Sequence, residues 1–293
     1  MSNQLKIVVS LAASTDEGRV RSHNEDDFVI IPDVVTTEGL SPSSKSFVLG
    51  NAGCLLVVAD GMGGAEAGEV ASQSTTQLIK KYVIANRLPK YDEEDIIPFV
   101  RFLVQKSYEN ILKIVEENLE YRGMGTTLVT AWVIGKVAYV GWVGDSRCYL
   151  YRKKKGMTQK TDDHSWVWEM VKSGQITPQE ANQHENRNII TRCIGDSKIA
   201  PVVDFVTFSL EKGDKILLCS DGLNTMIDDP EIAEIIGRDS DLNAIAEHLI
   251  YAANRAGGED NITVALLEVL ELFDSKPHKK KGFWRKVANM FNK

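Results

Sequence analysis

The sequence predicts an α+β fold, a four-layer α/β/β/α sandwich of two antiparallel sheets flanked by helices, with an inserted flap lobe. Runs of β-branched and aromatic residues recur along the chain and indicate strands. Short links between some of these runs favour antiparallel pairing. The linked runs are apolar on both faces, whereas an antiparallel sheet with one face in water alternates apolar and polar residues. Such a sheet needs a second sheet on one side and helices on the other.

The strand-like runs are short, and turn residues separate most of them. They cover residues 5–11, 28–31, 55–59, 126–134, 137–143, 147–152, 202–210, 215–219 and 262–269. Two links are especially tight, namely Gly135-Lys136 and Gly144-Asp145-Ser146. Because links of two or three residues are typical of β-hairpins, we expect antiparallel neighbours on either side of each one.

Helices that could cover the sheets follow from apolar spacing and from capping residues. Residues 66–86 follow a glycine-rich turn, and residues 95–119 carry apolar side chains at helical spacing. A third helix is expected over 241–256, with Asp241 as its N-cap and Gly257-Gly258 as its stop.

Residues 153–200 differ in composition from the rest of the chain. They are polar and contain only short helical stretches, at 165–172 and 178–182, which is typical of an inserted lobe. We call this segment the flap. The Ser, Thr, Gly and Pro residues of 36–46 indicate a surface loop.

Composition excludes several classes of protein. The chain has 293 residues, 43% of them hydrophobic, and a formal charge of −7, which is typical of a globular domain and not of a disordered chain. It lacks the ~20 consecutive apolar residues of a membrane span. Its four cysteines are scattered and form no CxxC pair, so we expect a reducing, cytoplasmic setting.

Charge is distributed unevenly along the chain. Seven of the 34 basic residues lie in residues 275–293, which contain no acid, and residues 1–274 therefore hold 27 basic and 41 acidic residues, a net charge of −14. Because a body with this charge repels phosphate backbones, no nucleic-acid partner is expected.

Four aspartates share one local pattern beside strand-like runs. Asp60, Asp145 and Asp221 each follow an apolar run and precede a small residue, and Asp260 stands just before a strand. Carboxylates that meet at one sheet edge would repel each other unless cations neutralise them. An all-oxygen donor set favours Mg²⁺ or Mn²⁺ over zinc. The alternative is that each Asp simply forms a turn, which Asp-Gly pairs commonly do.

The segment before the second strand adds a further polar group. Arg21 stands four residues before Glu25, so a guanidinium suited to bidentate phosphate contact could lie beside another carboxylate. On its own, the segment could equally be a solvated charge run.

Taken together, these residues resemble a known family. The motifs RSHNED, DGMGG, GTT, GDSR, SDG and GGEDN, in this order, are similar to those of the metal-dependent serine/threonine protein phosphatases of type 2C, the PPM family. The resemblance covers residues 8–270, and DDHSWVWEMVKSGQITPQEA resembles the flap of bacterial-type members. It implies the sandwich fold given above and a protein-serine/threonine phosphatase.

The resemblance also implies metal ligands. Asp60 is expected to bridge two central Mn²⁺ or Mg²⁺ ions, with the backbone carbonyl of Gly61 binding one of them. Asp221 and Asp260 correspond to ligands of the other ion. Asp145 corresponds to the ligand of a third, weaker ion that it shares with Asp221.

Four more residues receive roles in the same way. Glu25 corresponds to a carboxylate that binds through water, and Asp26 to a residue that supports the ligands. Arg21 corresponds to the arginine that holds the substrate phosphate. Asn261 follows Asp260 as it does in the family.

The implied reaction is hydrolysis of phosphoserine or phosphothreonine in proteins. A water activated between two cations attacks phosphorus directly, so no covalent enzyme intermediate is expected. Expected partners are phosphoprotein substrates and a cognate Ser/Thr kinase whose action the enzyme opposes. The alternative function is a catalytically inactive phosphoprotein-binding scaffold of the same fold. A P-loop enzyme is excluded because no GK[ST] follows DGMGG.

One position departs from the pattern of animal members, which have histidine directly after the DG pair. Here it is Met62, so the acid that protonates the leaving group is unassigned. His23 and His164 are candidates by sequence proximity only, and structural roles are the simpler interpretation. Arg192 is expected to anchor the flap. Trp166 and Trp168 are expected to pack within the flap or to meet a substrate protein.

The C-terminal residues lie outside the resemblance. We expect residues 1–274 to form the phosphatase catalytic domain and residues 275–293 a basic amphipathic tail. On a helix its apolar residues would share one face, namely Phe283, Trp284, Val287, Met290 and Phe291. Residues 279–293 could then bind an anionic membrane surface from the cytoplasmic side, a partner, or the acidic body. The alternative is a solvated, disordered tail.

Overall fold

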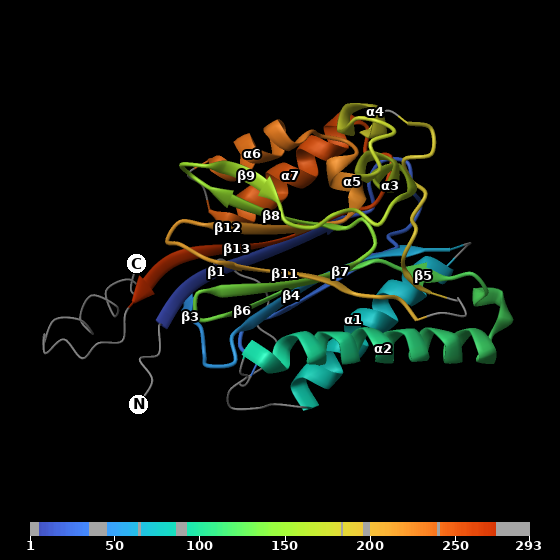
Figure 1. Cartoon of the computed structure of the whole chain (residues 1–293), viewed down its shortest axis with the longest axis horizontal. Coiled ribbons are helices and arrows are strands. Elements are labelled where there is room, and N and C mark those ends of the chain that lie inside the picture. The colour runs from blue at the N-terminus through green and yellow to red at the C-terminus, as the bar shows by residue number, and fades with distance from the viewer. Residues whose placement is uncertain are drawn as a thin grey trace, which may run out of the picture.

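Two antiparallel sheets lie face to face between two layers of helices (Figure 1). The computed structural model describes residues 6–34, 46–63, 66–85, 93–182, 184–195, 200–238 and 241–273. The first sheet has the order β3 (Phe47–Val48), β1 (Lys6–Asp16), β13 (Ile262–Phe273), β12 (Lys215–Cys219), β8 (Arg147–Arg152), β9 (Gly156–Gln159). The second has the order β10 (Ile194–Gly195), β5 (Gly125–Thr126), β4 (Cys54–Met62), β6 (Leu128–Ile134), β7 (Val137–Val143), β11 (Asp204–Ser209), and β2 (Asp26–Ile31) pairs with β4.

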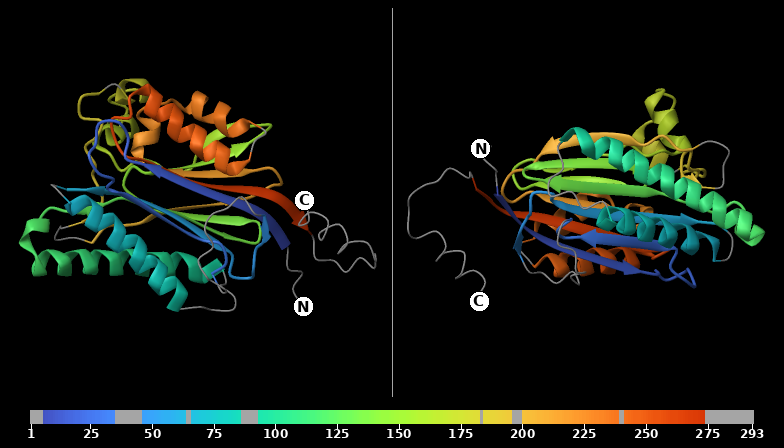
Figure 2. Two further views of the ribbon diagram at one scale, coloured as in Figure 1. Left: turned by 180° about the vertical axis from the view of Figure 1, so that it is seen from behind. Right: turned by 90° about the horizontal axis from the view of Figure 1, so that it is seen from below.

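Helices cover the outer face of each sheet, as Figures 1 and 2 show. The second sheet is covered by α1 (Ala67–Ala85) and α2 (Glu93–Glu117), after which a short 3-10 turn, η1 (Leu119–Tyr121), leads into β5. The first sheet is covered by α5 (Asp221–Asn224), α6 (Asp229–Gly237) and α7 (Leu242–Ala256). The flap helices α3 (Trp166–Lys172) and α4 (Pro178–Asn182) lie at one end of the sandwich, near α5. The predicted α+β sandwich is confirmed.

Three apolar cores explain why the strands are apolar on both faces. In β7, Tyr139 and Val143 pack toward α1 and α2, whereas Ala138 and Val140 pack between the two sheets. In the first sheet, alternate residues of β13 enter either the core between the sheets or the core beneath α5, α6 and α7. Long central strands such as β7 and β13 therefore contribute to two cores, because their side chains alternate in direction.

The end of α7 shows how local residues set an element's limits. Asp241 caps the first turn by accepting a hydrogen bond from the Asn243 N–H at 2.9 Å. At the other end Gly257 takes a φ of 147°, which lets the chain turn toward β13. Both ends agree with the sequence prediction, and the turn delivers Asp260 and Asn261 to the start of β13.

The hairpin predicted at Gly144-Asp145-Ser146 is wrong. β7 pairs with β6 and β11 in one sheet, and β8 pairs with β12 and β9 in the other, so this link crosses between the sheets. Gly144 permits the crossing because its φ is 108° and because a Cβ there would lie 2.6 Å from the Thr127 side chain. Length alone could not distinguish a hairpin from a crossing.

Some predicted boundaries also shift. The strand expected at 55–59 extends through Met62, so Asp60 lies inside β4 and not after it. Except for residue 46, the loop expected at 36–46 lies outside the described residues, as does the tail 275–293. No helix in the described part of the chain has the length and apolarity needed to cross a membrane.

Replacing Gly144 by alanine should destabilise the protein more than the same change at Gly135. Both residues have positive φ, but a Cβ at Gly135 meets nothing within 4 Å, whereas one at Gly144 collides with Thr127. We expect a loss of about 1 kcal/mol in the free energy of unfolding for Gly135→Ala and about 3 kcal/mol for Gly144→Ala, measured by urea unfolding. Equal losses would contradict the role of the crossing.

Candidate active site

The aspartates that the sequence singled out gather at one end of the sandwich. Asp60 comes from β4, Asp145 from the crossing between the sheets, Asp221 from the first turn of α5, and Asp260 from the turn before β13. The charges of Asp26, Asp145, Asp221 and Asp260 all act on the Asp60 carboxyl. Residues far apart in sequence thus meet because four separate elements end at the same edge.

The backbone of Asp60 is fixed by two neighbouring threonines. Its N–H donates to Thr127 Oγ1 at 3.0 Å, and its carbonyl accepts from Thr127 N–H at 2.8 Å and from Thr126 Oγ1 at 2.9 Å. Thr127 Oγ1 also lies 2.6 Å from Ser146 Oγ, beside Asp145. The GTT motif, to which sequence reasoning gave no role, therefore connects the two aspartates.

Gly61 stands where no side chain fits. A Cβ on this residue would lie 2.1 Å from the Gly68 carbonyl oxygen and 2.5 Å from the Glu25 carbonyl oxygen. Its N–H donates to that Glu25 carbonyl at 3.1 Å. Glycine at this position lets β4, the start of α1 and the residue before β2 approach each other, which places Glu25 beside Asp60.

Asn261 holds the loop that carries Arg21 and Glu25. Its side-chain oxygen accepts from the Glu25 N–H at 2.8 Å, and its amide donates to the carbonyls of His23 and Glu17 at 2.9 and 3.0 Å. Asn261 is only 3% exposed, so these bonds form away from water. They dock the loop against the turn that carries Asp260.

Ser220 has the corresponding role for Asp26. Its hydroxyl donates to Asp26 Oδ2 at 2.7 Å and accepts from the Thr263 N–H at 2.9 Å. Asp26 faces Asp60 in the pairing of β2 with β4. The contact of Ser220 therefore links the start of α5, and with it Asp221, to the Asp26–Asp60 pair.

Burial raises the pKa values of these carboxyls more than the nearby arginines lower them. It raises the pKa of Asp26 to about 7 and of Asp221 to about 6, and like charges add to the effect. The pKa values of Asp60 and Asp145 rise well above their usual range for the same two reasons, burial first and neighbouring aspartates second. Ionising all of these carboxyls together is therefore unfavourable unless further positive charge is supplied.

Arg21 brings positive charge to one side of this cluster. Arg21 Nη2 donates to Asp260 Oδ2 at 2.6 Å, and Arg21 Nη1 lies 3.8 Å from Glu25 Oε2. Its side chain remains 46% exposed. Arg21 thus lies at the rim of the carboxylate cluster, on the solvent side.

The donor chemistry fits a hard divalent cation. Every candidate ligand is an oxygen, and Glu25 Oε1 and Asp145 Oδ1 are buried without a hydrogen-bond partner in this structure. No set of three or more His, Cys, Asp or Glu side chains in the described part of the chain is already arranged to hold an ion. The oxygens are thus gathered but not closed into a ready-made coordination shell.

The comparisons with known proteins agree with the geometry. Residues 44–270 match the family model described as protein phosphatase 2C. The chain belongs to this family. The serine/threonine phosphatase stp of Listeria monocytogenes is 35% identical over 255 residues, which cover 87% of this chain and 93% of the relative. The resemblance drawn from the motifs is thereby confirmed, and with it the enzyme class.

Solved structures of the protein phosphatase 2C family share the fold. The serine/threonine phosphatase Stp1 from Staphylococcus aureus superposes with a TM-score of 0.79 and 33% identity, covering 90% of this chain and 96% of that one. The catalytic domain of the phosphatase PstP, in complex with two manganese ions, gives a TM-score of 0.72 and 32% identity, covering 91% and 100%. The family is metal-dependent, which agrees with the all-oxygen donor set described above.

Three further sequence candidates make contacts that join the flap to the body or lie within the flap. His164 is 1% exposed, accepts from the Gly144 N–H at 3.1 Å and lies 3.0 Å from Asp204 Oδ2, so it joins the flap to the body. Arg192 donates to the same Asp204 oxygen at 3.2 Å, which agrees with its expected anchoring role. Trp166 is 40% exposed and its ring meets His184 edge-on.

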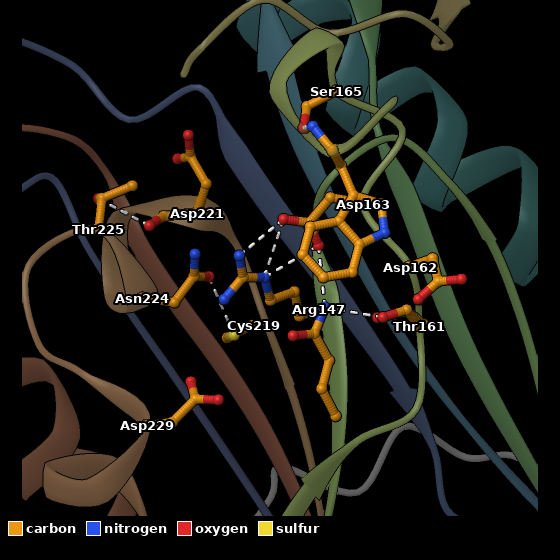
Figure 3. Close-up of polar contacts among 12 residues, drawn as sticks. Arg147, Thr161, Asp162, Asp163, Ser165, Cys219, Asp221, Asn224, Thr225 and Asp229 are labelled. Carbon is orange, nitrogen blue, oxygen red and sulfur yellow. Dashed lines mark hydrogen bonds and ion pairs between the residues drawn. The ribbon is translucent and has the colours of Figure 1, made fainter. Parts of the chain in front are cut away.

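A cleft between the flap and α5 opens beside the cluster. Its volume is about 710 Å³, and Asp145 and Asp221 lie in its wall together with Trp168. Arg147 and Asp163 also line it, and Figure 3 shows them joined by dashed lines close to Asp221. Sequence reasoning missed both residues, although Arg147 ends the GDSR motif and Asp163 belongs to the flap motif.

The raised pKa values predict how stability depends on pH when divalent cations are removed. The folded state keeps protons on Asp26 and Asp221 up to about pH 6–7, whereas the unfolded chain releases them near 3.8. The native state therefore binds more protons in this window, and the free energy of unfolding in EDTA should fall as pH rises, by up to about 1.4 kcal/mol per pH unit for each group. Urea unfolding between about pH 5 and pH 8 measures this slope.

The control for this prediction is Asp26→Asn, which keeps an acceptor for Ser220 but cannot ionise. Its pH dependence should be flatter, and in EDTA it should be more stable than the wild type at about pH 8. A wild-type stability that stays level or increases between about pH 5 and pH 7 would contradict the electrostatic description of the cluster.

Proposed function

We propose that this protein hydrolyses phosphoserine and phosphothreonine in proteins, using water activated by two divalent cations, Mn²⁺ or Mg²⁺. The observation that carries the proposal is the cluster of buried carboxylates whose pKa values are raised by burial and by mutual repulsion, with Arg21 at its rim. Such a cluster is unfavourable without cations, and a phosphoryl group brings further negative charge that cations and a guanidinium can hold.

The carboxylates would hold the cations. We assign Asp60 to both central ions, the Gly61 carbonyl to one, and Asp221 with Asp260 to the other. Asp145 would bind a further ion together with Asp221. When bound, the two central ions would supply the Lewis acidity that makes water nucleophilic near neutral pH.

The other residues orient the reactants. Arg21 is half-exposed and could turn from Asp260 to make a bidentate contact with the substrate phosphate. Glu25 would act through water, while Asp26, held by Ser220, and Asn261, held by three hydrogen bonds, would keep the site in shape. Met62, the last residue of β4, has no proton to give, so we assign protonation of the leaving oxygen to water.

The biological setting follows from the same proposal. An enzyme with this activity would oppose a Ser/Thr protein kinase and act on phosphoproteins in the cytoplasm. All four cysteines are free, as a reducing compartment requires. The division into a catalytic domain over 1–274 and a basic tail over 275–293, with membrane or partner contact through 279–293, stays a prediction.

Removing one central carboxylate should abolish turnover. With Mn²⁺ present, Asp60→Asn should lower kcat/KM on a phosphothreonine peptide by at least about 100-fold, because the bridging charge is lost. EDTA should have a similar effect on the wild type, and excess Mn²⁺ should reverse it. If the metal-loaded wild type is no faster than Asp60→Asn, the protein is the inactive scaffold and not an enzyme.

Arg21 can be tested against a neighbour on the same loop. Arg21→Ala should lower kcat/KM for the peptide by about tenfold or more, mainly through a higher KM, because a charge-assisted contact to the phosphate is lost. Arg19, also exposed, is anchored through its backbone N–H to the Gly258 carbonyl at 2.7 Å and serves as the control. An Arg19→Ala effect of equal size would show that only the overall charge of the loop matters.

A further inference from the structure

Two residues to which the proposed mechanism gives no role, Arg147 and Asp163, meet at the base of the flap. Arg147 Nε lies 2.9 and 3.2 Å from the two carboxylate oxygens of Asp163, and Arg147 Nη2 lies 2.6 Å from Asp163 Oδ2. The side chains are only 16% and 11% exposed. Figure 3 shows this fork together with Asp221 and Asn224 of α5. A buried, bidentate pair of this kind holds its two partners in a fixed geometry.

Further hydrogen bonds tie the pair to three elements. Gln159, at the end of β9, donates to Asp163 Oδ1 at 3.0 Å. Arg147 Nη1 donates to the Tyr149 hydroxyl at 3.0 Å, and that hydroxyl donates to Asp229 Oδ1 of α6 at 3.0 Å. The flap is therefore joined through Arg147 to the start of α6, whose Asp229 also lines the cleft.

The segment that contains Asp163 also forms hydrogen bonds with the chain on both sides of Asp145. Before Asp145, His164 N–H donates to the Gly144 carbonyl at 3.0 Å, and Gly144 N–H donates to His164 Nδ1 at 3.1 Å. After it, Cys148 N–H donates to Thr161 Oγ1 at 3.1 Å. The flap cannot shift at its base without disturbing the chain that places Asp145.

We propose that the Arg147–Asp163 pair is a positioning clamp that couples the orientation of the flap to the Asp145 side of the active site. Arg147 does not reach substrate in this role; it acts through Asp163. The catalytic consequence rests on the proposed function. Since the flap forms one wall of the cleft beside Asp145 and Asp221, a loosened clamp should weaken the binding of a peptide more than that of a small phosphate ester.

The chain offers a matched control on the same strand. Arg152, at the other end of β8, forks onto Asp214 with distances of 2.8 and 2.6 Å, and these side chains are 18% and 1% exposed. The Arg152 side chain also contacts Glu211 and the Ser209 carbonyl, neither of which belongs to the flap. The two arginines have similar side-chain exposure and make similar forks, and they differ in what they hold.

The experiment compares Arg147→Lys with Arg152→Lys, because lysine keeps the charge and loses the fork. Amide hydrogen exchange of residues 166–172 in EDTA should be about tenfold faster in Arg147→Lys and within about twofold of the wild type in Arg152→Lys. With Mn²⁺, Arg147→Lys should raise KM for a phosphothreonine peptide about fivefold, a larger change than in KM for p-nitrophenyl phosphate.

Two results would overturn the proposal. The first is flap exchange in Arg147→Lys that matches the wild type; the second is equal acceleration in Arg152→Lys, which would indicate a general loss of stability. If Arg147→Lys fails to fold, the double variant Arg147→Met/Asp163→Leu removes both buried charges together and takes its place. Hydrogen exchange is measured in EDTA and needs neither metal nor turnover. If the wild type proved inactive, the proposed function would be refuted, but the exchange measurement would still test the clamp.

Discussion

The mutual repulsion of buried carboxylates at one end of the sandwich is the constraint on which the rest of the structure depends. Burial and like charge raise the pKa values of Asp26, Asp60, Asp145 and Asp221 together. Folding stability must therefore be supplied elsewhere, by three apolar cores that use both faces of each sheet. The double-sided packing gives a platform rigid enough to hold groups that would otherwise move apart.

The framework around the cluster is largely neutral. Thr127 and Thr126 fix the Asp60 backbone, Ser220 binds Asp26, and Asn261 docks the loop of Glu25. Hydroxyls and amides can orient carboxylates without neutralising them, whereas lysine or arginine in the same places would compete with a cation. This neutral framework leaves the negative charge available to divalent ions.

Charged pairs appear where the flap meets the body. Arg147 with Asp163, and Arg192 with Asp204, join the flap to the two sheets through short, directional contacts. A buried ion pair such as Arg147–Asp163 contributes little net stability but fixes geometry, because breaking it leaves an unpaired charge, whereas Arg192–Asp204 is partly exposed. The flap thus has a defined orientation beside the cleft even though it carries little apolar core of its own.

The sequence by itself indicated the fold class through apolar periodicity, which is a local property, and the family through the resemblance of its ordered motifs, and it singled out the four aspartates that meet in the structure. It misassigned the link at Gly144, since a short glycine turn serves a hairpin and a sheet crossing equally well. The tight link at Gly135-Lys136 correctly predicted that β6 pairs with β7, but only the tertiary structure decided how the other strands pair, that Ser220 meets Asp26, and that Arg147 meets Asp163. These contacts join residues whose partners are set by how the sheets stack, and no local pattern encodes them.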